Sequence, residues 1–268
     1  MKKTYLNEFH ANNGGQMVDF AGWEMPVNYG SQILEHKEVR ENVGIFDVSH
    51  MAVFDFEGSR QVEFLEYLLP NDVNKILTST RALYSPLLDD EGMILDDLIV
   101  YHLGDENFRI ISNCGTRDQN NAWFKKVALN FDIAANFKEE ASIIALQGPK
   151  AKQYLGEMFD VDLEPFHIQT LDDVMIARTG YTGEVGFEII SNVSRGLELW
   201  NYFIEKGIKP VGLAARDTLR LEAGFNLYGS DMTIENHPYE SNLGWTIDMS
   251  NDARDFIGKS ALLDLQSD

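Results

Sequence analysis

Cysteine is almost absent from this 268-residue chain, which contains only Cys114. A single cysteine cannot form an internal disulfide, so a reducing compartment is the simpler interpretation and we expect a cytoplasmic protein. Cys114 is a weak candidate for a nucleophile, because no histidine and asparagine signature accompanies it. The first residues include two lysines but no apolar segment after them, so we expect no signal peptide.

Long apolar runs and positive charge are also scarce. No run approaches ~18 apolar residues, so we expect no transmembrane helix and no membrane partner. The net charge is −21, from 22 lysines and arginines against 43 aspartates and glutamates. This excess argues against nucleic acid and against an anionic membrane surface. A small anionic substrate stays possible, since a local pocket of arginines can oppose the overall charge.

Motifs for nucleotides, metals and serine hydrolases are missing as well. Gly14-Gly15 lacks the spacing of a dinucleotide-binding loop, and no phosphate-binding loop occurs. No serine nucleophile elbow occurs, and the six histidines show no metal-ligand spacing, so no metal is expected. Because these motifs are missing, an enzyme with this sequence would use acid and electrostatic chemistry on an organic cofactor.

The residues that are present indicate a core and a mixed fold. The hydrophobic fraction is 44%, and the length suits one large domain or two ordinary ones. Apolar spacing predicts helices over 33–41, 61–69, 197–205 and 215–223. Apolar runs predict strands over 98–101, 108–112, 142–146 and 186–190, with a hairpin turn at Gly104-Asp105. This mixture favours an α+β fold with antiparallel sheets.

Two adjacent carboxylates, Asp96 and Asp97, open the first predicted strand. Alternation along a strand puts their side chains on opposite faces, so one can face the interior. A buried acid is costly unless it has a partner, which a cationic substrate or a developing positive charge would supply. A solvated turn before the strand explains the same pattern.

Glycines and a further acid are combined in residues 177–190. Gly180, Gly183 and Gly186 indicate a tight turn where the backbone approaches another group closely. Glu188 lies between two apolar strand residues and can point inward, where a carboxylate suits the amidine-like edge of a heterocycle such as a pterin. A hairpin turn explains the glycines equally well.

Two arginines, Arg216 and Arg220, lie four residues apart on one face of the last predicted helix. A buried arginine usually has a carboxylate or a planar ligand as its partner. An internal ion pair with Asp217 or Glu222 explains these arginines as well as a ligand does.

Together these stretches resemble the aminomethyltransferase, or T-protein, family of the glycine cleavage system. The matching segments follow the family order over nearly the whole chain and are 20–27, 46–51, 95–101, 145–149, 178–190, 213–229, 244–247 and 254–258. One segment alone would be weak, but the ordered set is highly specific.

The resemblance implies two interwoven α+β domains with antiparallel sheets flanked by helices. The expected division places 1–50 and 141–230 in a discontinuous first folate-binding domain, and 51–140 and 231–268 in a second α+β domain. The family normally continues into a C-terminal β-barrel domain that helps to shape the lipoyl entry. We expect this domain to be missing here, where folate binding can survive while transfer is impaired.

The resemblance also implies a reaction. The family takes the aminomethyl group from the lipoyl arm of the H-protein, releases ammonia and passes the methylene to tetrahydrofolate. Asp97 matches the family's essential catalytic aspartate, which would stabilise positive charge on the methylene and orient the folate nitrogens. Asp96 is then expected to be scaffold.

Nine residues match positions of the folate site in the family. Glu188 corresponds to the carboxylate at the pterin edge and Arg216 to a folate-contacting arginine, while Tyr84 and Tyr228 are expected as aromatic walls. The full set is Met51, Tyr84, Asp97, Ile111, Asn113, Glu188, Arg216, Tyr228 and Trp245. The departure nearest this set is Met93, which stands where the family commonly has a second glycine.

Two other functions fit a related fold. A folate-binding module without transfer activity is one, although the Lys-Gly-Cys-Tyr motif of the relatives in iron–sulfur assembly is absent here. A folate-dependent demethylase acting on a sulfonium or N-methyl donor is the other, and it would share Asp97. The run 47–51 fits the T-protein better than the demethylase.

Overall fold

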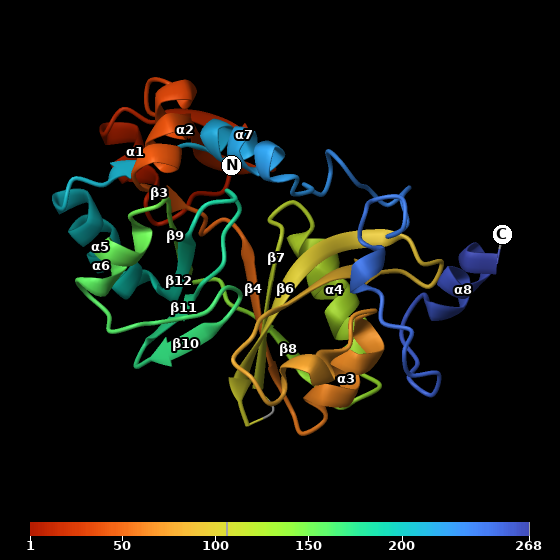
Figure 1. Ribbon diagram of the computed structural model, residues 1–268. Coiled ribbons are helices and arrows are strands. Elements are labelled where there is room, and N and C mark those ends of the chain that lie inside the picture. The colour runs from red at the N-terminus through yellow and green to blue at the C-terminus, as the bar shows by residue number, and fades with distance from the viewer. Residues whose placement is uncertain (106, 268) are drawn as a thin grey trace. The chain divides into compact units, whose positions relative to one another are not determined.

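The computed structural model describes residues 1–105 and 107–267. The chain forms two compact units, one from Met1–His50 with Glu140–Phe225 and one from Met51–Glu139 with Asn226–Asp268. The polypeptide therefore passes between the units three times, so each unit combines distant parts of the sequence (Figure 1). This confirms an α+β fold of two interwoven parts.

The first unit is built on a six-stranded sheet with the order β10-β11-β12-β9-β3-β13. Neighbouring strands are antiparallel, except for the short parallel pair of β13 with β3. A separate hairpin pairs β1 with β2. The strands are β1 (Gln16–Phe20), β2 (Trp23–Asn28), β3 (Gly44–Asp47), β9 (Ala141–Gln147), β10 (Ile168–Leu171), β11 (Val174–Ala177), β12 (Gly186–Asn192) and β13 (Lys209–Pro210).

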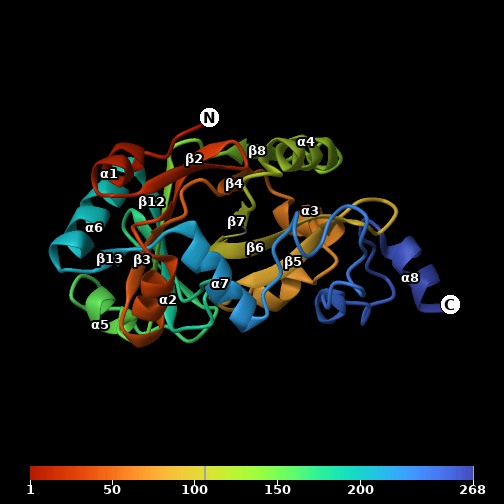
Figure 2. The same ribbon diagram turned by 90° about the horizontal axis from the view of Figure 1, so that it is seen from above.

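Helices pack around this sheet, and α2 and α7 lie side by side (Figure 2). On one face of the sheet, Ile144 and Ile189 join a buried cluster with Leu199 and Trp200 of α6. Alternation therefore turns Glu188 toward the opposite face. The helices are α1 (Asn7–Asn12), α2 (Gln32–Glu41), α5 (Ala151–Gly156), α6 (Val193–Glu205) and α7 (Leu213–Ala223).

The second unit is built on a five-stranded antiparallel sheet with the order β5-β6-β7-β4-β8. Short 3₁₀ helices cover Val73–Ile76 and Gly244–Thr246. The strands and α-helices are β4 (Ala52–Glu57), β5 (Leu83–Leu88), β6 (Ile94–Gly104), β7 (Asn107–Ser112), β8 (Ala134–Phe137), α3 (Gln61–Leu68), α4 (Arg117–Ala128) and α8 (Lys259–Ser267).

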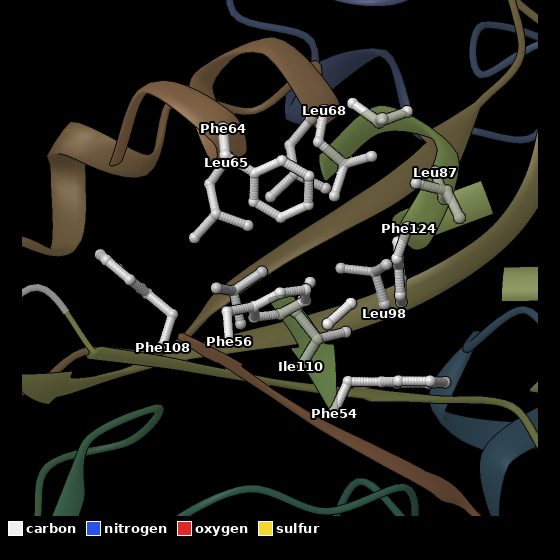
Figure 3. Packing of buried hydrophobic residues seen from close by; sticks show 14 of the residues in the cluster. Phe54, Phe56, Phe64, Leu65, Leu68, Leu87, Leu98, Phe108, Ile110 and Phe124 are labelled. Atoms are coloured by element: carbon white, nitrogen blue, oxygen red, sulfur yellow. The ribbon is translucent and has the colours of Figure 1, made fainter. Parts of the chain in front are cut away.

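Aromatic side chains fill the core between this sheet and helices α3 and α4 (Figure 3). Phe54 meets Phe124 of α4 edge to face at 5.0 Å between ring centroids, and Phe56 lies 5.2 Å from Phe64 of α3. Such pairs add about 0.5–1.5 kcal/mol to the hydrophobic burial. Only one face of β6 and β7 packs into this core, and the other face is left for further side chains.

The predicted helices and strands are confirmed. Helix 33–41 corresponds to α2, 61–69 to α3, 197–205 to α6 and 215–223 to α7. The predicted hairpin is β6 with β7, and the other two predicted strands are β9 and β12. Within the described part of the chain, no helix is long and apolar enough to cross a membrane.

Candidate active site

Asp96 and Asp97 lie inside strand β6, so the interpretation as a solvated turn is wrong. Asp96 is fully buried and pairs across the sheet with Leu87, whereas Asp97 pairs with Pro86 and is partly exposed. Asp96 shares its face with Leu98 and Val100, which belong to the core under α4. Asp97 therefore points from the opposite face, as expected for adjacent residues of a strand.

The carboxylate of Asp96 is surrounded by hydrogen-bond donors from one segment of the chain. Thr116 Oγ1 donates at 2.6 Å, and Asn120 Nδ2 donates at 2.5 Å from the first turns of α4. The backbone N–H of Asn113 donates at 3.3 Å and its Nδ2 at 2.7 Å. These bonds compensate the burial of the acid, which supports the scaffold role expected for Asp96.

Asp97 has fewer partners than its neighbour. Tyr84 Oη donates to Asp97 Oδ2 at 3.0 Å, and Asn113 Nδ2 donates to Asp97 Oδ1 at 2.9 Å. The amide of Asn113 thus bridges both carboxylates, and it follows directly after β7. Asp97 is held in place while part of its side chain stays accessible.

The environment changes the acidity of both groups. Burial raises the pKa of Asp97 to about 7, and the negative charge of Asp96 contributes to the same shift. Burial also raises the pKa of Asp96. An acid that titrates near neutral pH can take up or release a proton, or pair with a positive charge, under physiological conditions.

Aromatic side chains lie near this carboxylate in the second unit. Tyr84 stacks on Trp245 with 6.0 Å between centroids, and Trp245 itself is 69% exposed. Tyr228 donates to the carbonyl of Ile94 at 3.1 Å. Burial raises the pKa of Tyr228, and the charge of Asp97 is a smaller contribution. Ile111 pairs with Ile99 on the same face as Asp97. Met51 directly precedes β4. The second unit thus supplies seven of the nine predicted positions.

The other two predicted positions belong to the first unit, and Glu188 is one of them. It is buried in β12, where its cross-strand neighbours are Ala177 and Ala145. The hydroxyl of Thr179 donates to Glu188 Oε2 at 2.6 Å. A carboxylate has acceptor positions beyond the one that this hydroxyl occupies, so Glu188 can accept further N–H donors.

The two arginines of α7 have different partners. Arg220 forms an ion pair with Asp217 at 2.8 Å, so the internal pair expected as one alternative is confirmed for Arg220. The guanidinium of Arg216 lies 4.9 Å from the ring centre of Tyr181 and 5.9 Å from that of Phe46. Its Nη1 is buried without a hydrogen-bond partner among the described residues. A planar, negatively polarised ligand would satisfy this donor.

Electrostatics link Arg216 to Glu188. Burial lowers the pKa of the Arg216 guanidinium, and the charge of Glu188 opposes that shift. The first unit therefore has a buried carboxylate and a half-buried, donor-rich cation that interact electrostatically. These groups suit a flat heterocycle that carries N–H donors on one edge and an acceptor elsewhere.

Three further features are the lone cysteine, the possible metal-ligating side chains and the turn at Met93. Cys114 is buried, and burial raises the pKa of its thiol to about 11, which makes it a poor nucleophile at neutral pH. Within the described residues, no group of three or more acidic, histidine or cysteine side chains could hold a metal ion. The turn at Met93 closes through a hydrogen bond from its N–H to Asp89 Oδ1 at 2.9 Å.

Sequence reasoning missed the polar residues that hold these acids. Thr116 and Asn120 bond to Asp96, and Thr179 bonds to Glu188. Gln147 bonds to the loop that carries Thr179. Thr116 and Asn120 are four apart at the start of a helix, which is a local signal for a shared partner. The sequence around Thr116 and Asn120 does not indicate that Asp96 is this partner.

Comparison with known proteins agrees with this architecture. Residues 6–251 match the GCVT N-terminal domain family, which makes the chain a transferase of the GCVT class. An aminomethyltransferase of Francisella tularensis is 48% identical over 98% of this chain and 75% of its own length. One from Francisella philomiragia is 46% identical over the whole of this chain and 76% of its own.

A solved structure agrees as well. The crystal structure of the glycine cleavage system aminomethyltransferase T from Bartonella henselae superposes with a TM-score of 0.93. It is 36% identical and covers 99% of this chain and 75% of its own. The chain belongs to the aminomethyltransferase, or T-protein, family of the glycine cleavage system, as its resemblance to that family implied.

Proposed function

We propose that the chain transfers the methylene of an aminomethyl group to tetrahydrofolate and releases ammonia, with lipoylated H-protein as the donor. The observation that carries this proposal is Asp97, a restrained and partly exposed carboxyl group whose pKa is raised to about 7. The cytoplasmic location expected from the single cysteine remains a prediction.

Asp97 would act through its charge. Cleavage of the carbon–sulfur bond to the lipoyl arm leaves positive charge on the transferred methylene, and the electron pair goes to the departing sulfur. A fixed carboxylate with little surrounding water stabilises such charge better than bulk water does. Tyr84 and Asn113 hold the carboxylate in position, so little reorganisation is needed during the reaction.

The predicted binding residues suit a reduced folate as the acceptor. Glu188 and the unpartnered Nη1 of Arg216 would bind the edges of the pterin ring. In the second unit, Tyr84, Tyr228 and Trp245 offer flat aromatic surfaces that suit a reduced folate. Met51, Ile111 and Asn113 are the other positions there that the resemblance assigns to folate binding. Binding of the two reactants together would supply much of the rate acceleration.

The test is Asp97→Asn, which keeps the size of the side chain and removes the charge. We expect transfer from aminomethylated H-protein to fall by roughly 10²–10³. Tetrahydrofolate affinity, measured by calorimetry, should change by less than about threefold, because other residues supply most of the binding. Asp55→Asn is the matched control, since Asp55 forms an ion pair with Arg109 on the same sheet.

Three outcomes would be informative. Unchanged turnover in Asp97→Asn would contradict the role given to Asp97. Tetrahydrofolate binding by the wild-type chain without ammonia release would indicate the folate-binding module instead. Turnover with methylated sulfonium or amine donors, but not with H-protein, would indicate the demethylase.

A further inference from the structure

A buried glutamine supports the loop between β11 and β12 in the first unit. Gln147 is the last residue of β9 and is completely buried. Its Oε1 accepts from Thr182 Oγ1 at 2.8 Å, and its Nε2 donates to the carbonyl of Thr179 at 3.2 Å. Both ends of one amide are therefore bound to the same short loop.

Two glycines make room for this amide. A Cβ at Gly180 would lie 2.0 Å from Gln147 Oε1, and a Cβ at Gly186 would lie 2.2 Å from Gln147 Nε2. No side chain fits at such distances, so the amide fills the space that these glycines leave. The close approach expected from the glycines is thus to a side chain of the chain itself.

Thr179 connects the amide to Glu188. The carbonyl of Thr179 accepts from Gln147, and its hydroxyl donates to Glu188 Oε2 at 2.6 Å. The cross-strand neighbours of Glu188 are Ala177 and Ala145, whose methyl groups cannot orient a carboxylate. The hydroxyl of Thr179 therefore sets where the carboxylate points.

The same loop also supports Arg216. Tyr181 lies between Thr179 and Thr182 in sequence, and its ring centre is 4.9 Å from the guanidinium of Arg216. The ring of Tyr181 also stacks on Phe225, with 5.8 Å between ring centroids. One loop thus touches both residues of the first unit that are predicted to bind the heterocycle.

We propose that Gln147 is a positioning residue that fixes the loop 179–183, so that Thr179 orients Glu188 and Tyr181 supports Arg216 for binding a reduced pterin. The identity of this ligand rests on the proposed function, whereas the ordering of the loop does not. Gln147 acts through Thr179 and Tyr181 and needs no contact with the ligand.

The first experiment uses Gln147→Met, which keeps a similar length and loses both hydrogen bonds to the loop. We expect the Kd for tetrahydrofolate and the KM in turnover to rise about tenfold, which corresponds to the loss of one or two hydrogen bonds. The value of kcat should stay within about threefold, because these residues bind the heterocycle away from the transferred carbon.

Variants of Thr179 test the connection itself. Thr179→Val removes the hydroxyl that Glu188 accepts from, so it should weaken tetrahydrofolate binding as Gln147→Met does. Thr179→Ser keeps the hydroxyl and should bind tetrahydrofolate within about twofold of the wild type. Equal Kd values for the valine and serine variants would overturn the proposed connection.

A core variant of the same unit tests whether a general loss of stability alone could raise the Kd. Leu199→Ala lowers the melting temperature without touching the loop, because Leu199 packs on the other face of the sheet. Its Kd should match the wild type even where its melting temperature falls as far as that of Gln147→Met. If Gln147→Met has a lower melting temperature but binds tetrahydrofolate with the wild-type Kd, Gln147 only stabilises the fold and the proposal is wrong.

Hydrogen exchange without ligand separates this inference from the proposed function. Backbone amides of 179–183 should exchange faster in Gln147→Met than in the wild type, with little change in Leu199→Ala. If the wild-type chain fails to bind tetrahydrofolate, the proposed function fails, and faster exchange still supports the ordering of the loop. Unchanged exchange in Gln147→Met would overturn the inference whatever the ligand is.

Discussion

Asp96 and Asp97 are adjacent in the chain, yet their hydrogen bonds give them different chemistry. Asp96 accepts from Thr116, Asn120 and both the backbone and side chain of Asn113. Burial raises the pKa of both carboxyl groups, and the charge of Asp96 opposes ionisation of Asp97 further. The pair therefore keeps Asp97 protonated in mild acid and ionised above neutral pH.

This coupling predicts the pH dependence of the transfer. The value of kcat/KM should rise with pH through about 7, as Asp97 becomes ionised. Asp96→Asn removes the neighbouring charge, so the pKa of Asp97 should fall and the rise in activity should move to lower pH by roughly one unit. The measurement is the pH–rate profile of the two proteins.

A conservative variant serves as the control for this prediction. Thr116→Ser keeps the hydroxyl that donates to Asp96, so its profile should match the wild type. A profile of Asp96→Asn that rises at the wild-type pH would mean that another group controls the rate. Loss of folding in Asp96→Asn would be detected by its far-ultraviolet circular dichroism.

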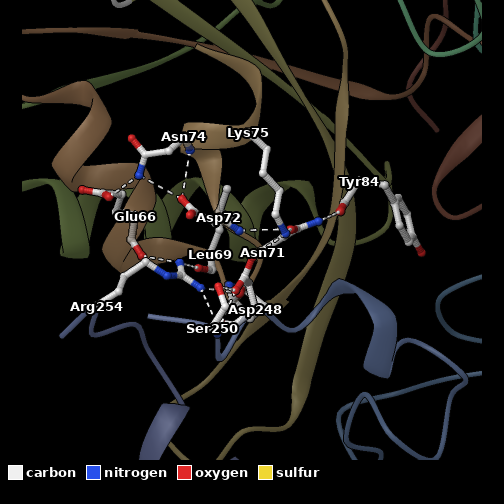
Figure 4. Close-up of polar contacts among 11 residues, drawn as sticks. Glu66, Leu69, Asn71, Asp72, Asn74, Lys75, Tyr84, Asp248, Ser250 and Arg254 are labelled. Atoms are coloured by element: carbon white, nitrogen blue, oxygen red, sulfur yellow. Dashed lines mark hydrogen bonds and ion pairs between the residues drawn. The ribbon is translucent and has the colours of Figure 1, made fainter. Parts of the chain in front are cut away.

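At the scale of elements, one arginine joins the end of helix α3 to a later loop of the second unit (Figure 4). Arg254 Nη1 donates to the carbonyls of Glu66 and Leu69, each at 3.1 Å. Its Nη2 donates to the carbonyls of Pro70 at 2.6 Å and Asp248 at 2.9 Å. The carbonyls of Glu66 and Leu69 lie at the C-terminal end of α3, where the helix lacks its own donors, so the guanidinium caps α3.

Removing this cap should destabilise the second unit. Arg254→Met removes four hydrogen bonds, and only the carbonyl of Pro70 keeps another donor among the described residues, the backbone N–H of Asp248. We expect the free energy of unfolding to fall by about 3–5 kcal/mol. Arg254→Lys should recover only part of this loss, since an ammonium group cannot reach the same set of carbonyls. Urea denaturation measures both values.

An exposed arginine gives the matched comparison. Arg81 is exposed at the surface of the same unit. The substitution Arg81→Met should therefore change the free energy of unfolding by less than about 0.5 kcal/mol. Similar losses for Arg254→Met and Arg81→Met would show that the four hydrogen bonds do not cap the helix as described.

Elements and their contacts differ in how far the sequence predicts them. Helix α6 and the hairpin of β6 with β7 follow from apolar spacing and turn residues, which act over a few positions. The burial of Asp96 depends on α4, which begins about 20 residues later and covers one face of the sheet. Local pattern shows that two acids face opposite ways, but only tertiary packing decides which face is buried.

The candidate site shows the same limit. Resemblance to the family selects Asp97, Glu188 and Arg216, because the motifs that carry them are matched along the chain. The roles of Gln147 and Thr179 follow only from the hydrogen bonds of the folded loop. A polar residue that acts through another residue has no pattern of its own in a single sequence.

At the scale of the whole molecule, the net negative charge and the buried acid pair both lower the stability of the fold as pH rises. The chain has an isoelectric point near 4.5, so its negative charge grows as pH rises above that value and like charges on the surface repel. A carboxyl group whose pKa is raised on folding stabilises the fold fully below its unfolded pKa of about 4. For Asp97 this contribution is lost as pH rises through about 7.

The salt concentration distinguishes the contribution of surface charge from that of Asp97. At roughly 0.5 M salt the Debye length is near 4 Å, so repulsion among surface charges is screened while the buried pair is affected much less. We expect the free energy of unfolding, measured in urea, to fall between pH 5 and pH 8 at low salt, and to fall less at high salt. The part that remains at high salt should be about 2–4 kcal/mol, given the shift of Asp97.

The Asp97→Asn variant tests whether Asp97 causes the pH dependence of stability that remains at high salt. The asparagine does not titrate, so the dependence on pH at high salt should shrink in this variant, while the effect of salt at pH 8 stays as in the wild type. A wild-type protein whose pH dependence disappears entirely at high salt would assign the effect to surface charge. In that case the pKa of Asp97 would lie near its ordinary value, and an activity that rises through pH 7 would need another titrating group.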